Sequence, residues 1–352
     1  ADSVQRNCAS GIQSITTAHD RWGASRGNIF LVGGAENMSR VPYMLTEVRF
    51  GLQLRHYTLL DGLWKGLTDP TTGQIMGRTA ENIAQKYSIT RKEQDTFATE
   101  SHRKAFGAQD KLGLQTVPVS VDDFFIQKET GHRFPKSSKK ITKDENIFRE
   151  WDDEKVLQKA ENSPAIFMDE SITSANETGT KFEKGTVVIE RQFSNQGTIT
   201  PFNSCPISDG AAAMVLVDSS LSEDLGIEPE AYVIDYDYAA CAPELMGEGP
   251  IYAVPKALAR AGLKMEQIDF VELNEAFAAQ ALACQRTLQI PDEKLNVWGG
   301  AIAMGHPVGA TGSYLTVKLI HILQHYKARY GIVAMCVGGG QGGCLIIENA
   351  KL

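Results

Sequence analysis

The stretch Gly305-His306-Pro307-Val308-Gly309-Ala310-Thr311-Gly312 opens a helical pattern that continues to about Tyr326. An apolar run, Ile332-Val333-Ala334-Met335-Cys336-Val337, follows it and ends at Gly338-Gly339-Gly340. The length and apolar character of this run predict a buried strand. A helix that leads into a buried strand is typical of layered α/β proteins.

The same order of elements occurs near the start of the chain. A helical pattern over residues 8–22 precedes Asn28-Ile29-Phe30-Leu31-Val32, which predicts a strand of a parallel layer ending at Gly33-Gly34. In each copy a reactive side chain precedes the helix, Cys8 in one and His306 in the other. Two similar halves packed face to face would bring both helix N-termini to one point.

Other patterns agree with an α/β protein. Two helices are expected over residues 79–110, the second starting at the capping box formed by Thr90 and Glu93. The remaining expected elements are a buried strand at 211–217, a helix at 254–261 closed by Gly262, a strand at 270–273 leading into a helix at 275–288, and a final strand at 344–347. Residues 118–195 indicate a surface subdomain.

Composition limits the class of protein. The 352 residues are 42% hydrophobic and 22% charged, with a net charge of −8, so wholesale disorder and a global basic surface for nucleic acid are excluded. No apolar run is long enough for a transmembrane helix, and no secretion signal is visible. The six cysteines are expected to be reduced thiols of a cytosol-like compartment, and none has zinc-site spacing.

Cys8 and His306 are candidate catalytic residues. Cys8 lies where a helix begins, and unpaired N–H groups and the helix dipole there favour a thiolate, a strong nucleophile toward carbonyls. The alternative is a small buried apolar residue. His306 can take a thiol proton and later donate to an oxyanion, or it is a surface histidine in a turn.

Two further motifs carry polar groups at strand ends. The glycines after Cys336 free backbone N–H groups to converge on an anion, and the Cys336 thiol could move a proton. A phosphate loop or a plain turn are alternatives, although no Lys-Ser/Thr pair follows the glycines. Asn274, at a strand-to-helix junction, either caps the helix or holds a catalytic water.

Taken together and in this order, four motifs resemble the thiolase family, in particular acetyl-CoA acetyltransferases and 3-ketoacyl-CoA thiolases. The motifs are Asn7-Cys8-Ala9-Ser10-Gly11, Asn274-Glu275-Ala276-Phe277, Gly305-His306-Pro307 and Cys336-Val337-Gly338-Gly339-Gly340. Supporting stretches are 33–39, 76–82 and 208–213. The resemblance covers nearly the whole chain and is poorest over residues 118–195.

The resemblance implies a layered αβαβα fold of two similar halves with an inserted loop subdomain. The N-terminal half would comprise residues 1–38 and 206–225, the loop subdomain 39–205, and the C-terminal half 226–352. The family has a further strand-rich portion before its nucleophile, so we expect part of the N-terminal half to precede Ala1. It also forms homodimers and homotetramers.

The resemblance also implies residue roles. Cys8 would be the acylated nucleophile, and His306 would take its proton and form one oxyanion hole with a water held by Asn274. Cys336 would be the acid and base, and the N–H groups of Cys8 and Gly338 would form a second hole. Residues implied on the coenzyme A side are Met76, Ser204 and Cys205. The basic run that contains Lys136, Lys139 and Lys140 is either a solvated loop or a set of phosphate neighbours, and the resemblance does not decide between them.

The implied activity is that of an acyl-CoA C-acyltransferase of fatty acid and lipid metabolism. It would condense two acetyl-CoA to acetoacetyl-CoA and coenzyme A, or cleave 3-ketoacyl-CoA, with no metal or organic cofactor and no nucleic-acid or membrane partner. A ketoacyl synthase-like enzyme and an inactive thiolase-shaped protein are alternatives. We expect a cytoplasmic protein, with mitochondria and peroxisomes left open. Two departures from the family pattern are Ile75 before Met76, often a histidine, and Cys205, usually a serine.

Overall fold

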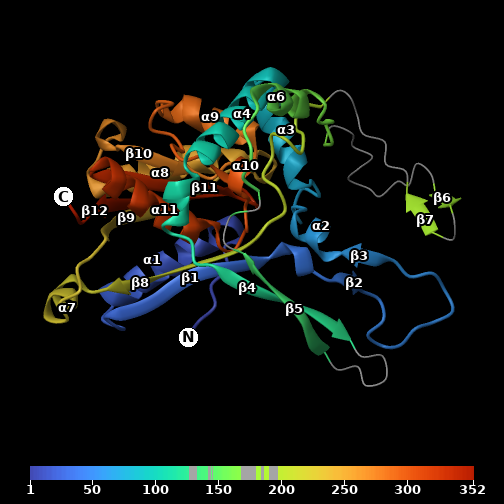
Figure 1. The fold of residues 1–352 in the computed structure, drawn as a ribbon, viewed down its shortest axis with the longest axis horizontal. Helices are drawn as coiled ribbons and strands as arrows, with labels where there is room; N and C mark the ends of the chain where they lie inside the picture. The colour runs from blue at the N-terminus through green and yellow to red at the C-terminus, as the bar shows by residue number, and fades with distance from the viewer. Residues whose placement is uncertain (127–132, 142–143, 145, 168–179, 184–185, 190–196) are drawn as a thin grey trace.

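The computed structural model describes residues 1–126, 133–141, 144, 146–167, 180–183, 186–189 and 197–352 (Figure 1). Helices and strands alternate in layers over most of the molecule, and a hairpin arm extends from one side. In the part of the chain that the structure describes, no helix combines the length and apolar character needed to cross a membrane.

Two sheets enclose a central pair of helices. The first sheet pairs β1 (Ile29–Asn37) with β8 (Asp209–Val217), and the second has the order β10-β11-β12-β9. Between them lie α1 (Ser10–Gly23) and α11 (Thr311–Tyr326), whose apolar side chains pack with those of both sheets in one buried cluster. The strands of the second sheet are β9 (Ala231–Ala240), β10 (Phe270–Leu273), β11 (Tyr330–Val337) and β12 (Gln341–Asn349).

A second cluster covers the other face of the β10-β11-β12-β9 sheet. It joins α8 (Gly249–Ala261) and α9 (Ala278–Leu288) to apolar residues of the strands. Strand β10 runs parallel to β11, whereas β12 runs antiparallel to both β11 and β9. The two layers of helices therefore bury this sheet on both faces, which explains the continuous apolar run of β11.

The two central helices touch through glycine. A Cβ atom placed on Gly11 of α1 would lie 2.4 Å from the backbone nitrogen of Ser313, and one placed on Gly312 would lie 2.4 Å from that of Ile12. Only glycine permits two backbones to come this close. The N-terminal turns of the helices that follow Cys8 and His306 therefore meet, as the repeated helix-strand pattern predicts.

The loop subdomain and the connections hold the remaining elements. Thr90 and Glu93 form the predicted capping box at the start of α4 (Arg91–Gly107), in which both reciprocal hydrogen bonds are present. The other elements there are β2 (Tyr43–Leu45), β3 (Leu59–Asp61), α2 (Gly62–Gly66), α3 (Met76–Lys86), α5 (Gln109–Gly113), β4 (Val119–Ile126), β5 (Arg133–Ile141), α6 (Asp153–Glu161), β6 (Thr180–Glu183) and β7 (Thr186–Ile189). Outside it lie α7 (Ser219–Asp224) and α10 (Ala301–Met304).

Three expectations about elements are wrong. β1 does not end at Gly33-Gly34 or belong to a parallel layer, because it runs through both glycines antiparallel to β8. The glycines instead allow the backbone of neighbouring segments to approach closely. A Cβ on Gly34 would lie 2.0 Å from the Gly309 carbonyl oxygen. β8 is not a buried strand, because its residues alternate and Val215 is 59% exposed. α9 begins at Ala278, later than the expected start at residue 275, and residues 274–277 are not helical.

Candidate active site

Cys8 lies in a tight turn directly before α1. Asn7–Ala9 forms a 3-10 turn, and α1 follows from Ser10. The Ser10 hydroxyl donates to the Asn7 carbonyl oxygen at 2.7 Å and accepts the Arg6 N–H at 2.9 Å, which fixes this turn. Asn7 has a left-handed φ of 43°, a conformation that asparagine tolerates better than most residues.

The Cys8 thiol has an environment that favours its neutral form at rest. Burial raises the pKa of Cys8, and nearby Glu36 adds to the increase. The N–H groups of Gly338 and of Cys8 itself bond the sulfur and lower the pKa, but burial outweighs them. The expectation of a resting thiolate is therefore wrong. A base must remove the Cys8 proton before the sulfur can attack a carbonyl.

His306 is a buried imidazole whose two nitrogens have different partners. Its Nδ1 lies 2.6 Å from the Thr311 hydroxyl, and its Nε2 lies 3.4 Å from the amide nitrogen of Asn274. The Thr311 hydroxyl donates its single proton to the Pro307 carbonyl oxygen at 2.9 Å, so it must accept from Nδ1. Nε2 then carries the lone pair, as a base requires.

Burial also lowers the pKa of His306 to about 4, so the imidazole is neutral near pH 7. Only 5% of the residue is exposed, and its backbone N–H donates to the Ser208 hydroxyl at 3.2 Å. The interpretation of His306 as a surface turn residue is therefore wrong. A neutral, held imidazole can accept a proton when substrate reaches the thiol.

Asn274 follows strand β10 and faces His306 rather than a helix. The residue that caps α9 is Phe277, so the interpretation of Asn274 as a helix cap is wrong. The backbone N–H of Asn274 donates to Ala334 on β11 at 2.9 Å. Its side-chain oxygen is buried and has no hydrogen-bond partner among the described residues. This oxygen is free to hold a water or a substrate group.

Glu275 anchors the segment that carries Asn274. Its buried carboxylate accepts hydrogen bonds from the Ser101 hydroxyl at 2.6 Å, the Asn296 amide at 2.7 Å and the Ile302 N–H at 3.2 Å. These donors come from α4, a loop and α10. The carboxylate therefore connects α4, a loop and α10 next to Asn274. The position of Glu275 near an expected helix start did not predict this role.

Cys336 is a fully buried thiol on β11, two residues before Gly338. Burial raises its pKa well above the ordinary value, and the nearby Cys8 adds to this increase. The side chain packs in an apolar cluster with Met246, Ala276 and Phe277. A thiol in such surroundings is a strong base once it has lost its proton.

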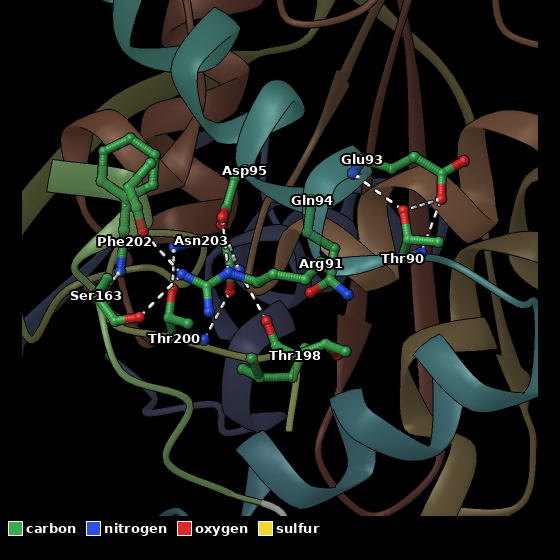
Figure 2. A network of polar contacts seen from close by, with 12 residues as sticks. Thr90, Arg91, Glu93, Gln94, Asp95, Ser163, Thr198, Thr200, Phe202 and Asn203 are labelled. Carbon is green, nitrogen blue, oxygen red and sulfur yellow. Dashed lines mark hydrogen bonds and ion pairs between the residues drawn. The ribbon is translucent and has the colours of Figure 1, made fainter. Parts of the chain in front are cut away.

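A network of polar contacts fixes the segment that ends at Cys205 (Figure 2). Asn203 donates to Asp95 of α4 at 2.9 Å, and its side-chain oxygen accepts the Thr200 N–H at 2.8 Å. The Cys205 N–H then donates to the carbonyl oxygen of Ala276 at 3.1 Å. This segment therefore lies directly against the stretch that carries Asn274.

An open cavity of about 730 Å³ leads to Cys8. Cys8, Gly338, Met76 and Glu36 line it, together with residues of the loop subdomain such as Leu63 and Asp69. The volume suits a small-molecule site. His306, Asn274 and Cys336 are buried and are not part of the lining, so Cys8 and Gly338 are the predicted catalytic groups that face the cavity.

The residues predicted on the coenzyme A side have different places. Met76 lines the cavity beside Gly338, where a Cβ on the glycine would lie 3.4 Å from the methionine sulfur. Ser204 does not line the cavity: it is 8% exposed, and its hydroxyl donates to the Thr200 carbonyl oxygen at 2.7 Å. Burial raises the pKa of Cys205 to about 12, and the neighbouring Cys8 adds to this. The side chains of Lys136, Lys139 and Lys140 lie outside the described residues.

Sequence reasoning missed the partners that orient these groups. Thr311 and Asn7 stand inside the quoted motifs but had no assigned role, and Ser208 is part of a supporting stretch. Thr311 follows His306 by five residues at the start of α11, a spacing that could have indicated contact. Within the described residues, no group of three or more His, Cys, Asp or Glu side chains is arranged to hold a metal ion.

Comparisons with known proteins identify the family. The model of the thiolase N-terminal domain matches residues 1–153, and that of the thiolase C-terminal domain matches 227–349. A probable acetyl-CoA acyltransferase of Staphylococcus aureus is 36% identical, covering 99% of this chain and 79% of that protein. The chain belongs to the thiolase family.

Solved structures agree with this assignment. Human mitochondrial 3-ketoacyl-CoA thiolase superposes with a TM-score of 0.82 at 33% identity, covering 98% of this chain and 78% of that one. Bacillus anthracis acetyl-CoA acetyltransferase gives a TM-score of 0.83 at 32% identity with the same coverage. The predicted family and thiolase-like α/β fold are thus confirmed, and the predicted class of enzyme, an acyltransferase, is supported.

Proposed function

We propose that this chain is an acetyl-CoA C-acyltransferase that works through an acyl-Cys8 intermediate. In one direction it condenses two acetyl-CoA to acetoacetyl-CoA and coenzyme A, and in the other it cleaves 3-ketoacyl-CoA. The main support is the Cys8 sulfur, which lies at the cavity wall, accepts the N–H of Gly338 and has the buried Cys336 thiol nearby. Family membership and the names of the relatives support the same reaction.

In the first half-reaction the Cys8 sulfur attacks the thioester carbon of acetyl-CoA. The thiol proton moves to Nε2 of His306, whose lone pair is available because Thr311 accepts from Nδ1. The N–H groups of Cys8 and Gly338 stabilise the negative oxygen of the tetrahedral intermediate. The carbon–sulfur bond to coenzyme A breaks, and its thiolate takes the proton of Cys336.

In the second half-reaction the Cys336 thiolate removes a proton from the methyl group of a second acetyl-CoA. The apolar surroundings that raise the pKa of Cys336 make its thiolate a base strong enough for a weak carbon acid. The enolate oxygen is stabilised by the protonated His306 and a water on Asn274. The enolate carbon attacks acetyl-Cys8, and the released sulfur recovers its proton from His306, so the site returns to its initial state.

This scheme predicts ping-pong kinetics and needs no metal or organic cofactor, since coenzyme A thioesters are the substrate and product. We further propose that the chain acts as a homodimer or homotetramer, as expected from the family resemblance, which light scattering would test. The cytoplasmic location expected from the sequence stays a prediction.

The test is the intact mass of the protein after incubation with acetyl-CoA. We expect one acetyl adduct, mapped to Cys8, and loss of the acetoacetyl-CoA enolate absorbance when coenzyme A is added. Cys8→Ala should abolish both signals. Cys344→Ala, which removes a buried thiol in the cluster beneath the second sheet, is the matched control and should retain them. Full turnover by Cys8→Ala, or activity only with malonyl donors, would contradict the proposal.

A further inference from the structure

The three-glycine turn joins β11 to β12 and is closed by the Val337–Gln341 pair, and the Cys241 N–H donates to the Gly340 carbonyl oxygen at 2.8 Å. Gly339 and Gly340 have left-handed φ angles of 88° and 78°. None of the three residues has a side chain that could fix the turn, and glycine samples more backbone conformations than any other residue. The N–H of Gly338 nevertheless has to stay on the Cys8 sulfur. The position of this N–H therefore depends on the flanking strands and on contacts that other segments make with the turn.

Two contacts connect the Cys8 turn to this glycine turn. The Asn7 amide donates to the Gly338 carbonyl oxygen at 3.3 Å. The Arg6 guanidinium donates to the side-chain oxygen of Gln341 at 3.0 Å, on the far side of the glycines. Neighbouring residues before Cys8 thus hold the glycine turn at both ends.

The Arg6 contact is itself held in place. Its Nε donates to Gln13 of α1 at 2.6 Å, and its guanidinium lies 4.1 Å from the centre of the Tyr238 ring on β9. An arginine with stacking and hydrogen-bond partners on rigid elements has little freedom to move. It therefore gives the Gln341 end of the turn a fixed reference on both α1 and the second sheet.

The backbone of Asn7 also differs from that of two other left-handed residues, Gln289 and Lys327. Gln289 and Lys327 are C-caps of helices, where this conformation is common. Asn7 instead lies one residue before the reactive thiol, at the entry to a helix. Its conformation directs the side-chain amide toward Gly338 while the next residue presents its sulfur.

We propose that Asn7 is a positioning residue that, with the Arg6–Gln341 contact, fixes the Gly338 N–H over the Cys8 sulfur. The two halves of one oxyanion hole come from segments far apart in the sequence, and the Asn7 side chain joins them directly. The inference rests on the proposed function for its kinetic consequence. Its structural consequence, the environment of the Cys8 sulfur, can be measured without any turnover.

The central variant is Asn7→Gly, which keeps the left-handed backbone but removes the amide. We expect kcat to fall roughly 10- to 100-fold with little change in KM, because the reacting groups lose alignment rather than affinity. The rate of Cys8 alkylation by iodoacetamide should shift to higher pH, because the sulfur loses a well-placed donor. Gln341→Leu, which removes the other contact without changing charge, should shift both measurements in the same direction.

The matched control is Ser25→Gly, at an exposed residue with a φ of 55° that does not line the cavity. It places glycine at a left-handed backbone position in the same way and should leave kcat and the alkylation curve unchanged. Wild-type kcat and an unshifted alkylation curve in Asn7→Gly would overturn the inference. If the wild-type protein forms no acetyl-Cys8, the proposed function fails, but the alkylation curves still decide the role of Asn7.

Discussion

Replacing Gly11 by alanine tests the contact between the two central helices. The new methyl group would lie 2.4 Å from the backbone nitrogen of Ser313 and 2.9 Å from the carbonyl carbon of Gly312, where an ordinary contact begins at 3.4 Å. Backbone atoms cannot rotate away as a side chain does. The helices must therefore separate by about 1 Å, a distance set by these contacts.

This separation would move Cys8 relative to His306, because Cys8 lies two residues before α1 and His306 lies five residues before α11. A misplacement of about 1 Å between reacting groups lowers a rate by about 100-fold. Overpacking of this kind costs about 1–3 kcal/mol of unfolding free energy, partly offset by the roughly 1 kcal/mol better helix propensity of alanine. We therefore expect a larger loss in kcat than in stability.

The assay compares kcat for thiolysis of acetoacetyl-CoA and the urea unfolding midpoint of three proteins. These are the wild type, Gly11→Ala, and Gly23→Ala as the control on the same helix. A Cβ on Gly23 meets no atom within 4 Å, so this variant should retain the wild-type kcat and be at least as stable as the wild type. Wild-type kcat in Gly11→Ala would refute the argument that contact between the helices sets the geometry of the site.

Two further predictions concern buried histidines. Thr311→Val removes the acceptor of the His306 Nδ1 proton at nearly constant volume and should lower kcat by about 10- to 100-fold, whereas Thr311→Ser should retain most activity; equal rates of the two variants would exclude this role. Burial lowers the pKa of both His306 and His102 to about 4, below their value near 6.5 when unfolded. The unfolded chain therefore binds these protons first, and stability should fall as the pH drops from about 6.5 to about 4, by up to about 3 kcal/mol for each histidine. His102→Phe should reduce this pH dependence by about half in urea titrations at several pH values, and an unchanged dependence would contradict the assignment to buried histidines.

Elements with local signals were predictable from the sequence. The capping box at Thr90 fixes the start of α4, and Gly262, with a φ of 66°, closes α8 where expected. The pairing of β1 with β8 was not predictable in the same way. Its partner lies far along the chain, and glycines within β1 serve the approach of other backbone rather than the end of a strand.

The candidate site also combines features that the sequence predicted with features that only the folded chain determines. Cys8, His306, Asn274 and Gly338 stand in motifs that indicate their chemistry, and the structure places His306 beside Asn274 and Gly338 beside Cys8. The protonation of Cys8 depends on how deeply the folded chain buries its sulfur, which its place before a helix did not reveal. The hydrogen bonds of Ser204 likewise depend on the path of the 198–205 segment.

The division of the site between the two ends of the chain has a consequence for biosynthesis. Cys8 emerges from the ribosome long before β11 and the glycine turn that carries the Gly338 N–H. Until that strand has entered its sheet, the thiol has neither its donor nor its buried neighbours. The nascent polypeptide is therefore expected to carry an ordinary cysteine, and acyl transfer begins only after β11 and the glycine turn have been translated.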